Sequence, residues 1–74
     1  MNHTDRKVIY VRLLEEGVDV FRPVYGYLLD DGRYEIDVSQ PYDRDDEIWE
    51  FPPGSRVMVE DKILEGKPVP VAIA

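Results

Sequence analysis

The sequence predicts an all-β domain, folded as a small barrel of about five strands. Apolar and polar residues alternate with the period of a strand along most of the chain, and no window places apolar residues at helical spacing. Short clusters rich in glycine and proline separate these runs, as turns do. The 74 residues suit one domain, which we assign to 1–74 with a polar tail at 1–6.

Two strands are predicted in the first third of the chain. The first covers residues 7–14 and ends at Glu15-Glu16-Gly17. One face of this strand carries Ile9, Val11 and Leu13. A second run at 18–29 is interrupted by Pro23. Because proline cannot donate a ladder hydrogen bond, we place it at a bend or on a sheet edge.

A hairpin turn is the clearest local signal. Asp30-Asp31-Gly32-Arg33 lies between two strand-like runs, and Asp-Gly is typical of such turns because glycine accepts a positive φ without steric cost. The strand after it alternates cleanly. We expect Tyr34, Ile36 and Val38 to face the core, and Glu35 and Asp37 to face water.

The C-terminal half continues the pattern of short runs and turns. It divides into a polar loop at 39–47, a short strand at 48–51, a strand around Val57 and Val59, a turn at 65–67 and a final strand at 68–74. Pro68 and Pro70 share one parity of that last strand, which suits an edge whose nitrogens face solvent. A meander with one helical turn near 43–47 and an OB-like barrel are the alternatives, although an OB-fold usually has more residues.

The C-terminal third also resembles a known fold family. Residues 52–59, Pro-Pro-Gly-Ser-Arg-Val-Met-Val, followed by Glu65-Gly66-Lys67, resemble SH3-like barrel domains, in which a Pro-Gly turn launches a strand and a glycine turn returns the chain. A small SH3-like barrel also fits the length. The segments 21–24, 31–34 and 46–54 are similar to a group of small, uncharacterised bacterial proteins, over roughly 8–73 in all. That group implies no activity for this chain.

The resemblance does not extend to the ligands of better-known SH3-like domains. Peptide-binding SH3 domains carry an Ala-Leu-Tyr-Asp-Tyr type segment and paired tryptophans, and this sequence has neither. Recognition of proline-rich peptides is therefore not expected. The ribosomal and transcription-factor branch is usually basic around its glycine turn, whereas the charges of residues 56–67 cancel here. RNA binding is correspondingly disfavoured.

Composition excludes further classes. The chain has no cysteine, hence no disulfide and no thiolate, and its one histidine, His3, makes a structural zinc site improbable. With 9 basic and 16 acidic side chains the net charge is −7, which repels phosphate backbones and disfavours nucleic acid. No apolar run is long enough to span a membrane, and Met1–Lys7 lacks the apolar stretch of a signal peptide. We expect a cytoplasmic protein without cofactor or metal.

The candidate site is an acidic loop with aromatic neighbours. We predict that it contacts a protein partner, with a basic protein as one candidate. The residues predicted to do so are Tyr42, Asp43, Asp45, Asp46, Glu47 and Trp49. Asp43, Asp45 and Glu47 alternate as oxygen ligands do in a calcium loop, but the glycine and the distant bidentate glutamate of such a loop are missing. Nothing in the sequence indicates a pocket that would shift these carboxyl groups toward acid–base catalysis, so we do not expect an enzyme.

Two functions remain as hypotheses. The first is a non-enzymatic protein-interaction module that docks through a strand edge or an aromatic patch. The alternative is an acidic inhibitor of a basic protein, of the antitoxin, immunity or nucleic-acid-mimic type. We also predict a homodimer, formed through the final strand or through the strand at 48–51, because a small domain without disulfide or metal gains from burying more apolar surface.

Overall fold

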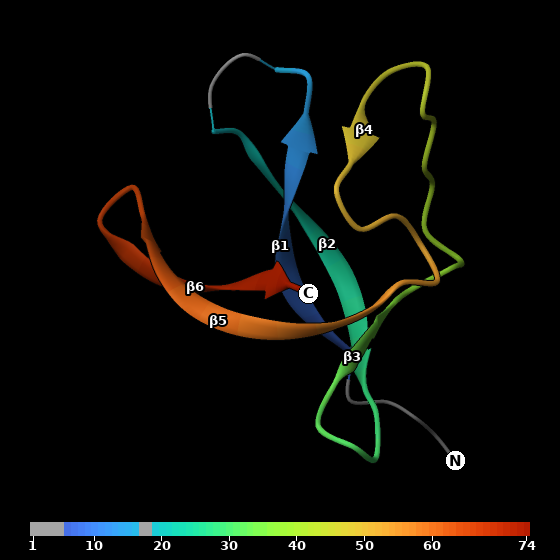
Figure 1. Cartoon of the computed structure of the whole chain (residues 1–74), viewed down its shortest axis with the longest axis vertical. Coiled ribbons are helices and arrows are strands. Elements are labelled where there is room, and N and C mark those ends of the chain that lie inside the picture. The colour runs from blue at the N-terminus through green and yellow to red at the C-terminus, as the bar shows by residue number, and fades with distance from the viewer. Residues whose placement is uncertain (1–5, 17–18) are drawn as a thin grey trace.

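The computed structural model describes residues 6–16 and 19–74, and all the regular structure in them is β. The six strands are β1 (Arg6–Leu14), β2 (Phe21–Leu28), β3 (Tyr34–Ile36), β4 (Ile48–Trp49), β5 (Arg56–Leu64) and β6 (Lys67–Ile73) (Figure 1). The described residues include no helix, and thus none that could cross a membrane. The predicted polar tail, apart from Arg6, and the sequence signals at Gly17 and Val18 lie outside the described residues.

Five of these strands close into a barrel. The strand order is β2-β3-β5-β6-β1, and β1 pairs again with β2 to complete the circle. The β1–β2 pair is antiparallel from Arg6 opposite Tyr27 to Arg12 opposite Phe21. Closure between β6 and β1 is parallel and consists of one pair, Tyr10 opposite Val71. The prediction of a small SH3-like barrel is confirmed, with β4 added as an extra strand at the end of β1.

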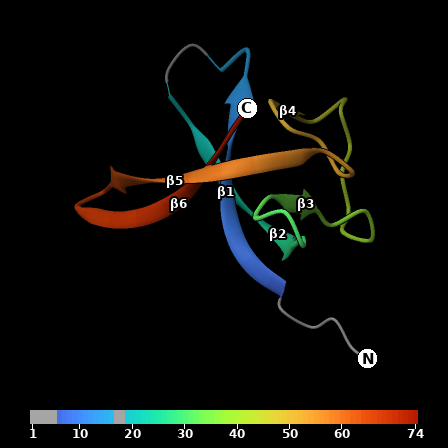
Figure 2. The same ribbon diagram turned by 60° about the horizontal axis from the view of Figure 1, so that its bottom comes forward.

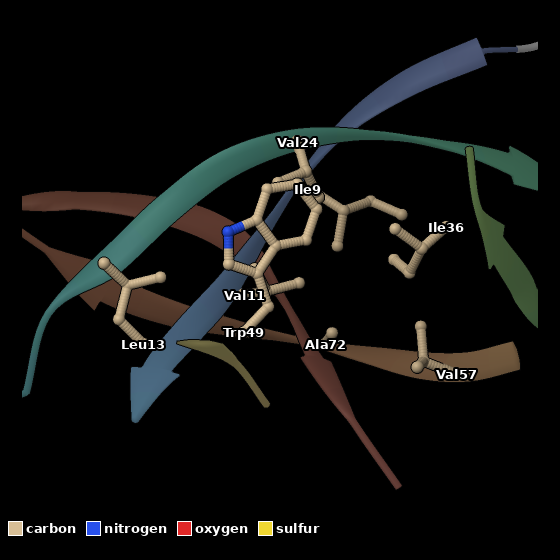
Figure 3. Close-up of a cluster of buried hydrophobic side chains, with 8 residues drawn as sticks. All are labelled: Ile9, Val11, Leu13, Val24, Ile36, Trp49, Val57 and Ala72. Carbon is tan, nitrogen blue, oxygen red and sulfur yellow. The ribbon is translucent and has the colours of Figure 1, made fainter. Parts of the chain in front are cut away.

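The core fills the barrel with side chains from every strand. Its buried members are Ile9, Val11, Leu13, Val24, Ile36, Trp49, Val57 and Ala72 (Figure 3). The shared face predicted for β1 is confirmed, since its three alternating apolar residues are all buried. The indole ring of Trp49 lies in the middle of the cluster, although β4 is only two residues long.

The turn predicted at Asp31-Gly32 joins β2 to β3. Gly32 has a φ of 89°, and its N–H donates to the carbonyl of Leu29 at 3.1 Å. The N–H of Leu29 donates to the carbonyl of Arg33 at 2.7 Å, which closes the loop. The Asp31 carboxylate accepts a hydrogen bond from the N–H of Arg33 at 3.0 Å. Gly32 thus supplies the positive φ of the turn, and Asp31 supplies a side-chain acceptor for its backbone.

The side-chain alternation predicted for residues 34–38 is wrong at its end. Val38 is 68% exposed rather than buried, and Asp37 is 4% exposed rather than in water. The reason is that β3 ends at Ile36, after which the chain turns. Asp37 stabilises that turn by accepting hydrogen bonds from the N–H and hydroxyl of Ser39. A period of two holds only while the backbone stays extended.

The second hairpin, β5–β6, extends away from the rest of the barrel as an arm (Figure 2). Its turn at Glu65-Gly66 has two successive positive φ angles, 53° and 81°, as in the two-residue turns that suit twisted hairpins. The Pro-Gly turn before β5 is held by a hydrogen bond from the N–H of Gly54 to the carbonyl of Ile36 at 2.8 Å. Both glycine turns predicted in the C-terminal third are confirmed.

The prolines lie where the sheet leaves one side of a strand unpaired. Pro23 is in β2 beyond the part, residues 26–28, that pairs with β3. Pro68 and Pro70 are in the part of β6 that pairs with β5, while β6 meets β1 only at Val71. The edge positions predicted for Pro68 and Pro70 are confirmed, and of the two positions predicted for Pro23, a bend or an edge, the structure shows the edge. A missing N–H does no harm on an unpaired edge.

Candidate functional site

Hydrogen bonds from Asp43 organise the acidic loop. Its carbonyl accepts from the N–H of Asp46 at 3.0 Å and of Glu47 at 3.2 Å, and its carboxylate accepts from the N–H of Asp45 at 2.9 Å. The result is a single turn capped by a side chain, as at a helix start. The side chains of Asp43, Asp45 and Asp46 are exposed, and none of them forms an ion pair with another described residue.

Glu47 links the acidic loop to the barrel. Its carboxylate forms an ion pair with Arg22 of β2 and accepts a hydrogen bond from the indole N–H of Trp49 at 2.9 Å. Burial alone would raise the pKa of Glu47, but the hydrogen bonds from Arg22 and Trp49 and the positive charge of Arg22 lower it overall. Glu47 is therefore a structural carboxylate, already paired on the protein side.

Trp49 is a core residue and not an exposed anchor for a partner. It is 4% exposed, and its ring lies against that of Tyr42, with 4.6 Å between centroids and 52° between planes. The backbone N–H of Trp49 also donates to the Tyr42 hydroxyl at 3.3 Å. The proposed aromatic patch is wrong for Trp49, because the two-residue β4 turns the indole inward beside β1.

A shallow hollow still brings most of the predicted residues together. It measures about 500 Å³ and is lined by Arg22, Pro41, Tyr42, Asp43, Asp46, Glu47 and Trp49. Of the six predicted residues only Asp45 is not part of this lining. The hollow presents the half-buried ring of Tyr42, and the exposed carboxylates of Asp43 and Asp46 lie beside it.

Asp37 and Gln40 were missed as structural residues by the sequence patterns. Asp37 is buried, and the hydrogen bond from the backbone of Ser39 lowers its pKa against the effect of burial, with help from the Ser39 hydroxyl and Arg6. Its second oxygen, Oδ2, lies 3.5 Å from Arg6 Nη1 and has no hydrogen-bond partner among the described residues. Arg6 also lies over the Tyr25 ring, 4.3 Å from its centroid.

The side-chain amide of Gln40 continues the sheet where β3 stops. Its oxygen accepts from the N–H of Tyr25 at 2.9 Å, and its nitrogen donates to the Tyr25 carbonyl at 3.0 Å and the Asp37 carbonyl at 2.9 Å. One glutamine therefore replaces a strand residue along β2. No motif in the sequence indicates this role, since the partner lies fifteen positions away.

A larger groove lies between the arm and the far end of β1 and β2. It measures about 800 Å³ and is lined by Tyr10, Asp19, Val20, Phe21, Lys62, Ile63, Leu64, Glu65, Lys67 and Val69. Asp19 at its rim forms an ion pair with Arg12 at 3.4 Å. The lining mixes apolar side chains with charges of both signs, so the groove does not by itself indicate the chemistry of a ligand.

The two edges of the arm differ in what they offer. Pro68 and Pro70 have no N–H, so the pairs they form with Ile63 and Asp61 are the non-hydrogen-bonded pairs of the hairpin. The N–H and C=O groups of Asp61 and Ile63 therefore point away from β6. On that side β5 pairs with β3 only at Arg56 and Val57. The outer edge of β5 is thus an open hydrogen-bonding edge, while the edge of β6 is blocked.

The outer edge of β5 is protected by charged side chains alone, those of Glu60, Asp61 and Lys62. β5 has no proline, and all four of its residues from Glu60 to Ile63 are exposed. The side chain of Ile63 is 68% exposed. Natural proteins usually protect an edge strand against pairing with other chains, as the two prolines protect β6.

No protein-family model, no curated protein and no solved structure matches this chain.

Proposed function

We propose that this chain is a non-enzymatic protein-interaction module that docks a protein partner through the outer edge of β5. The observation that supports the proposal is the open ladder of β5 beyond Val57, beside a β6 edge closed by two prolines. A partner segment in extended conformation can add to such an edge, with main-chain hydrogen bonds supplying affinity and alternate side chains supplying specificity. The compartment we propose is a bacterial cytoplasm, which the absence of cysteine and the resemblance over roughly 8–73 support.

The experiment that tests this proposal uses a proline on the edge. Asp61→Pro removes an N–H that points away from β6, so the β5–β6 ladder keeps all of its hydrogen bonds. Asp61→Ala removes the same charge and keeps the N–H, which makes it the matched control. The wild type and both variants are used as bait in affinity capture, with cross-links from Lys62 read by mass spectrometry. We expect partner capture to survive Asp61→Ala and to be lost with Asp61→Pro; equal capture by both variants contradicts edge docking.

The acidic loop supports a second candidate function, an acidic inhibitor of a basic protein. Asp43, Asp45 and Asp46 are exposed and form no ion pair with described residues, so their charges are available to a partner. Charges at the rim of an interface mainly raise the association rate. Replacing Asp45 and Asp46 by Asn should slow association with a basic target, by an amount that shrinks as salt rises. An association rate insensitive to both the substitutions and salt contradicts this function.

A further inference from the structure

We infer that the outer edge of β5 pairs with the same edge of a second copy of this chain, forming a symmetric antiparallel dimer. The inference rests on the proposed function, because it names the partner of the same edge. It differs from the two dimer surfaces expected from the sequence. The edge of β6 carries prolines, and β4 is a two-residue strand that already pairs with β1.

Symmetry restricts the register that such a pair can adopt. In a two-fold antiparallel pair, each residue of one copy faces one residue of the other, and the roles reverse across the axis. Hydrogen-bonded pairs join residues whose N–H and C=O groups point outward, which in β5 include Asp61 and Ile63. By the same alternation the N–H and C=O groups of Val59 point outward as well. A two-fold axis through Asp61 places residues with outward-pointing N–H and C=O groups opposite each other, as hydrogen-bonded pairing requires.

The side chains of β5 are complementary to themselves in that register. Lys62 of each copy faces Glu60 of the other, which gives two pairs of opposite charge. Both are non-hydrogen-bonded positions, where opposed side chains approach most closely. Ile63, one of the most exposed apolar side chains of the described residues, faces the half-buried Val59 of the second copy. Exposed apolar surface and exposed charge are thus both matched.

Neighbouring registers lose this match. An axis through Lys62 places the two Lys62 side chains opposite each other, and an axis through Glu60 does the same for the two Glu60 carboxylates. Each arrangement replaces two attractive pairs by a repulsive one. The register centred on Asp61 retains one unfavourable contact, Asp61 against its own copy, because like charges directly opposite destabilise a sheet. The dimer we infer is therefore a weak one that one substitution should tighten.

The decisive experiment is a charge swap measured by analytical ultracentrifugation over a dilution series. Lys62→Glu turns two attractive pairs into two repulsive ones and should weaken the dimer roughly tenfold. Adding Glu60→Lys to the same chain restores opposite charges across the axis and should recover most of that loss. The composition of the double variant equals that of the wild type, so net charge is constant. A double variant as weak as Lys62→Glu alone overturns the register.

Two further variants complete the test. Asp61→Asn removes the like-charge contact at the axis and should tighten the dimer several-fold. Asp61→Pro removes the central N–H of the edge and should abolish it. If Asp61→Pro fails to fold, as circular dichroism would show, the charge swap still decides. All substitutions lie at exposed positions.

The outcomes separate self-pairing from edge docking in general. A wild type that sediments as a monomer at about 1 mM overturns the dimer. If that monomer still captures another protein that Asp61→Pro loses, edge docking stands and only the identity of the partner is wrong. If the dimer forms and responds to the charge swap, the second copy is the partner of the edge.

Discussion

The two glycine hairpins of this chain start from similar turn chemistry and end in different surroundings. In the β2–β3 hairpin, Gly26 and Ile36 lie opposite each other and are both buried in the barrel. In the β5–β6 hairpin, the four residues from Glu60 to Ile63 are exposed. A turn signal specifies that two strands pair, but it does not specify what covers their faces. The first hairpin is part of the barrel wall, and the second presents its edge to other molecules.

The largest expected contrast between the two regions is in the free energy of unfolding. Trp49→Ala empties the centre of the barrel core and should cost about 3–5 kcal/mol, a large fraction of the stability of so small a domain. Ile63→Ala on the arm should stay within about 0.5 kcal/mol of the wild type. Urea titrations at low protein concentration, where self-association does not contribute, make the comparison. Equal losses at the two sites contradict the assignment of the arm to the surface.

The barrel wall is tightly packed around Gly26. A Cβ added there would lie 2.7 Å from Ile9 Cδ1 and 3.3 Å from the carbonyl oxygen of Glu35. Gly26→Ala should therefore destabilise by about 1–3 kcal/mol.

The double variant with Ile9→Val identifies the obstacle. Valine lacks the Cδ1 atom, so the combined loss should be smaller than the sum of the two single losses. Strict additivity in the same urea titrations would mean that Ile9 is not what the new methyl group meets.

The turn glycines differ from Gly26, because strain rather than crowding limits substitution. Gly32 has a φ of 89° and Gly66 a φ of 81°, and a Cβ on either would have nothing within 4 Å. A left-handed conformation costs a non-glycine residue roughly 1–2 kcal/mol. Gly32→Val should lower the free energy of global unfolding by about that amount.

Gly66→Val should have a smaller global effect, since the arm can open without exposing the core. Amide hydrogen exchange distinguishes the two cases. We expect faster exchange confined to residues around 62–69 in the arm variant, and faster exchange throughout the barrel in the Gly32 variant. Barrel-wide exchange in both would show that the arm unfolds only with the rest.

The smallest expected effect is the contribution of the buried Asp37 to the pH dependence of the free energy of unfolding. The backbone and hydroxyl of Ser39, with Arg6, hold the pKa of Asp37 below its ordinary value despite burial. Because the folded pKa is the lower one, the carboxylate stabilises the fold above the ordinary value of about 3.9. That stability is lost as the pH falls through the folded pKa.

The free energy of unfolding measured from about pH 6 to about pH 2 should therefore fall less steeply in Asp37→Asn than in the wild type. Asp30→Asn, at an exposed position of the β2–β3 loop, is the matched control. Identical slopes for the wild type and Asp37→Asn would assign the acid sensitivity to other groups.

The residues that the sequence did place correctly act through their own backbone or their immediate neighbours. Gly32 and Gly66 adopt positive φ because they lack a Cβ, and Pro68 and Pro70 are tolerated because an edge needs no N–H. The alternation that buries Ile9, with its two neighbours on the same face of β1, follows from the period of an extended strand. These properties are local, so they could be predicted together with the barrel class.

Which side chains become buried by pairing between distant segments was decided by the tertiary structure alone. Trp49 is buried because β4 pairs with β1, and Gln40 completes the edge of β2 from fifteen residues away. Asp37 is buried because β3 ends at Ile36, two residues earlier than its pattern indicates. The open edge of β5 likewise depends on how short β3 is, since β3 pairs with only two of the nine residues of β5. Burial and free edges are relations between distant segments, and a period read along one segment carries no information about them.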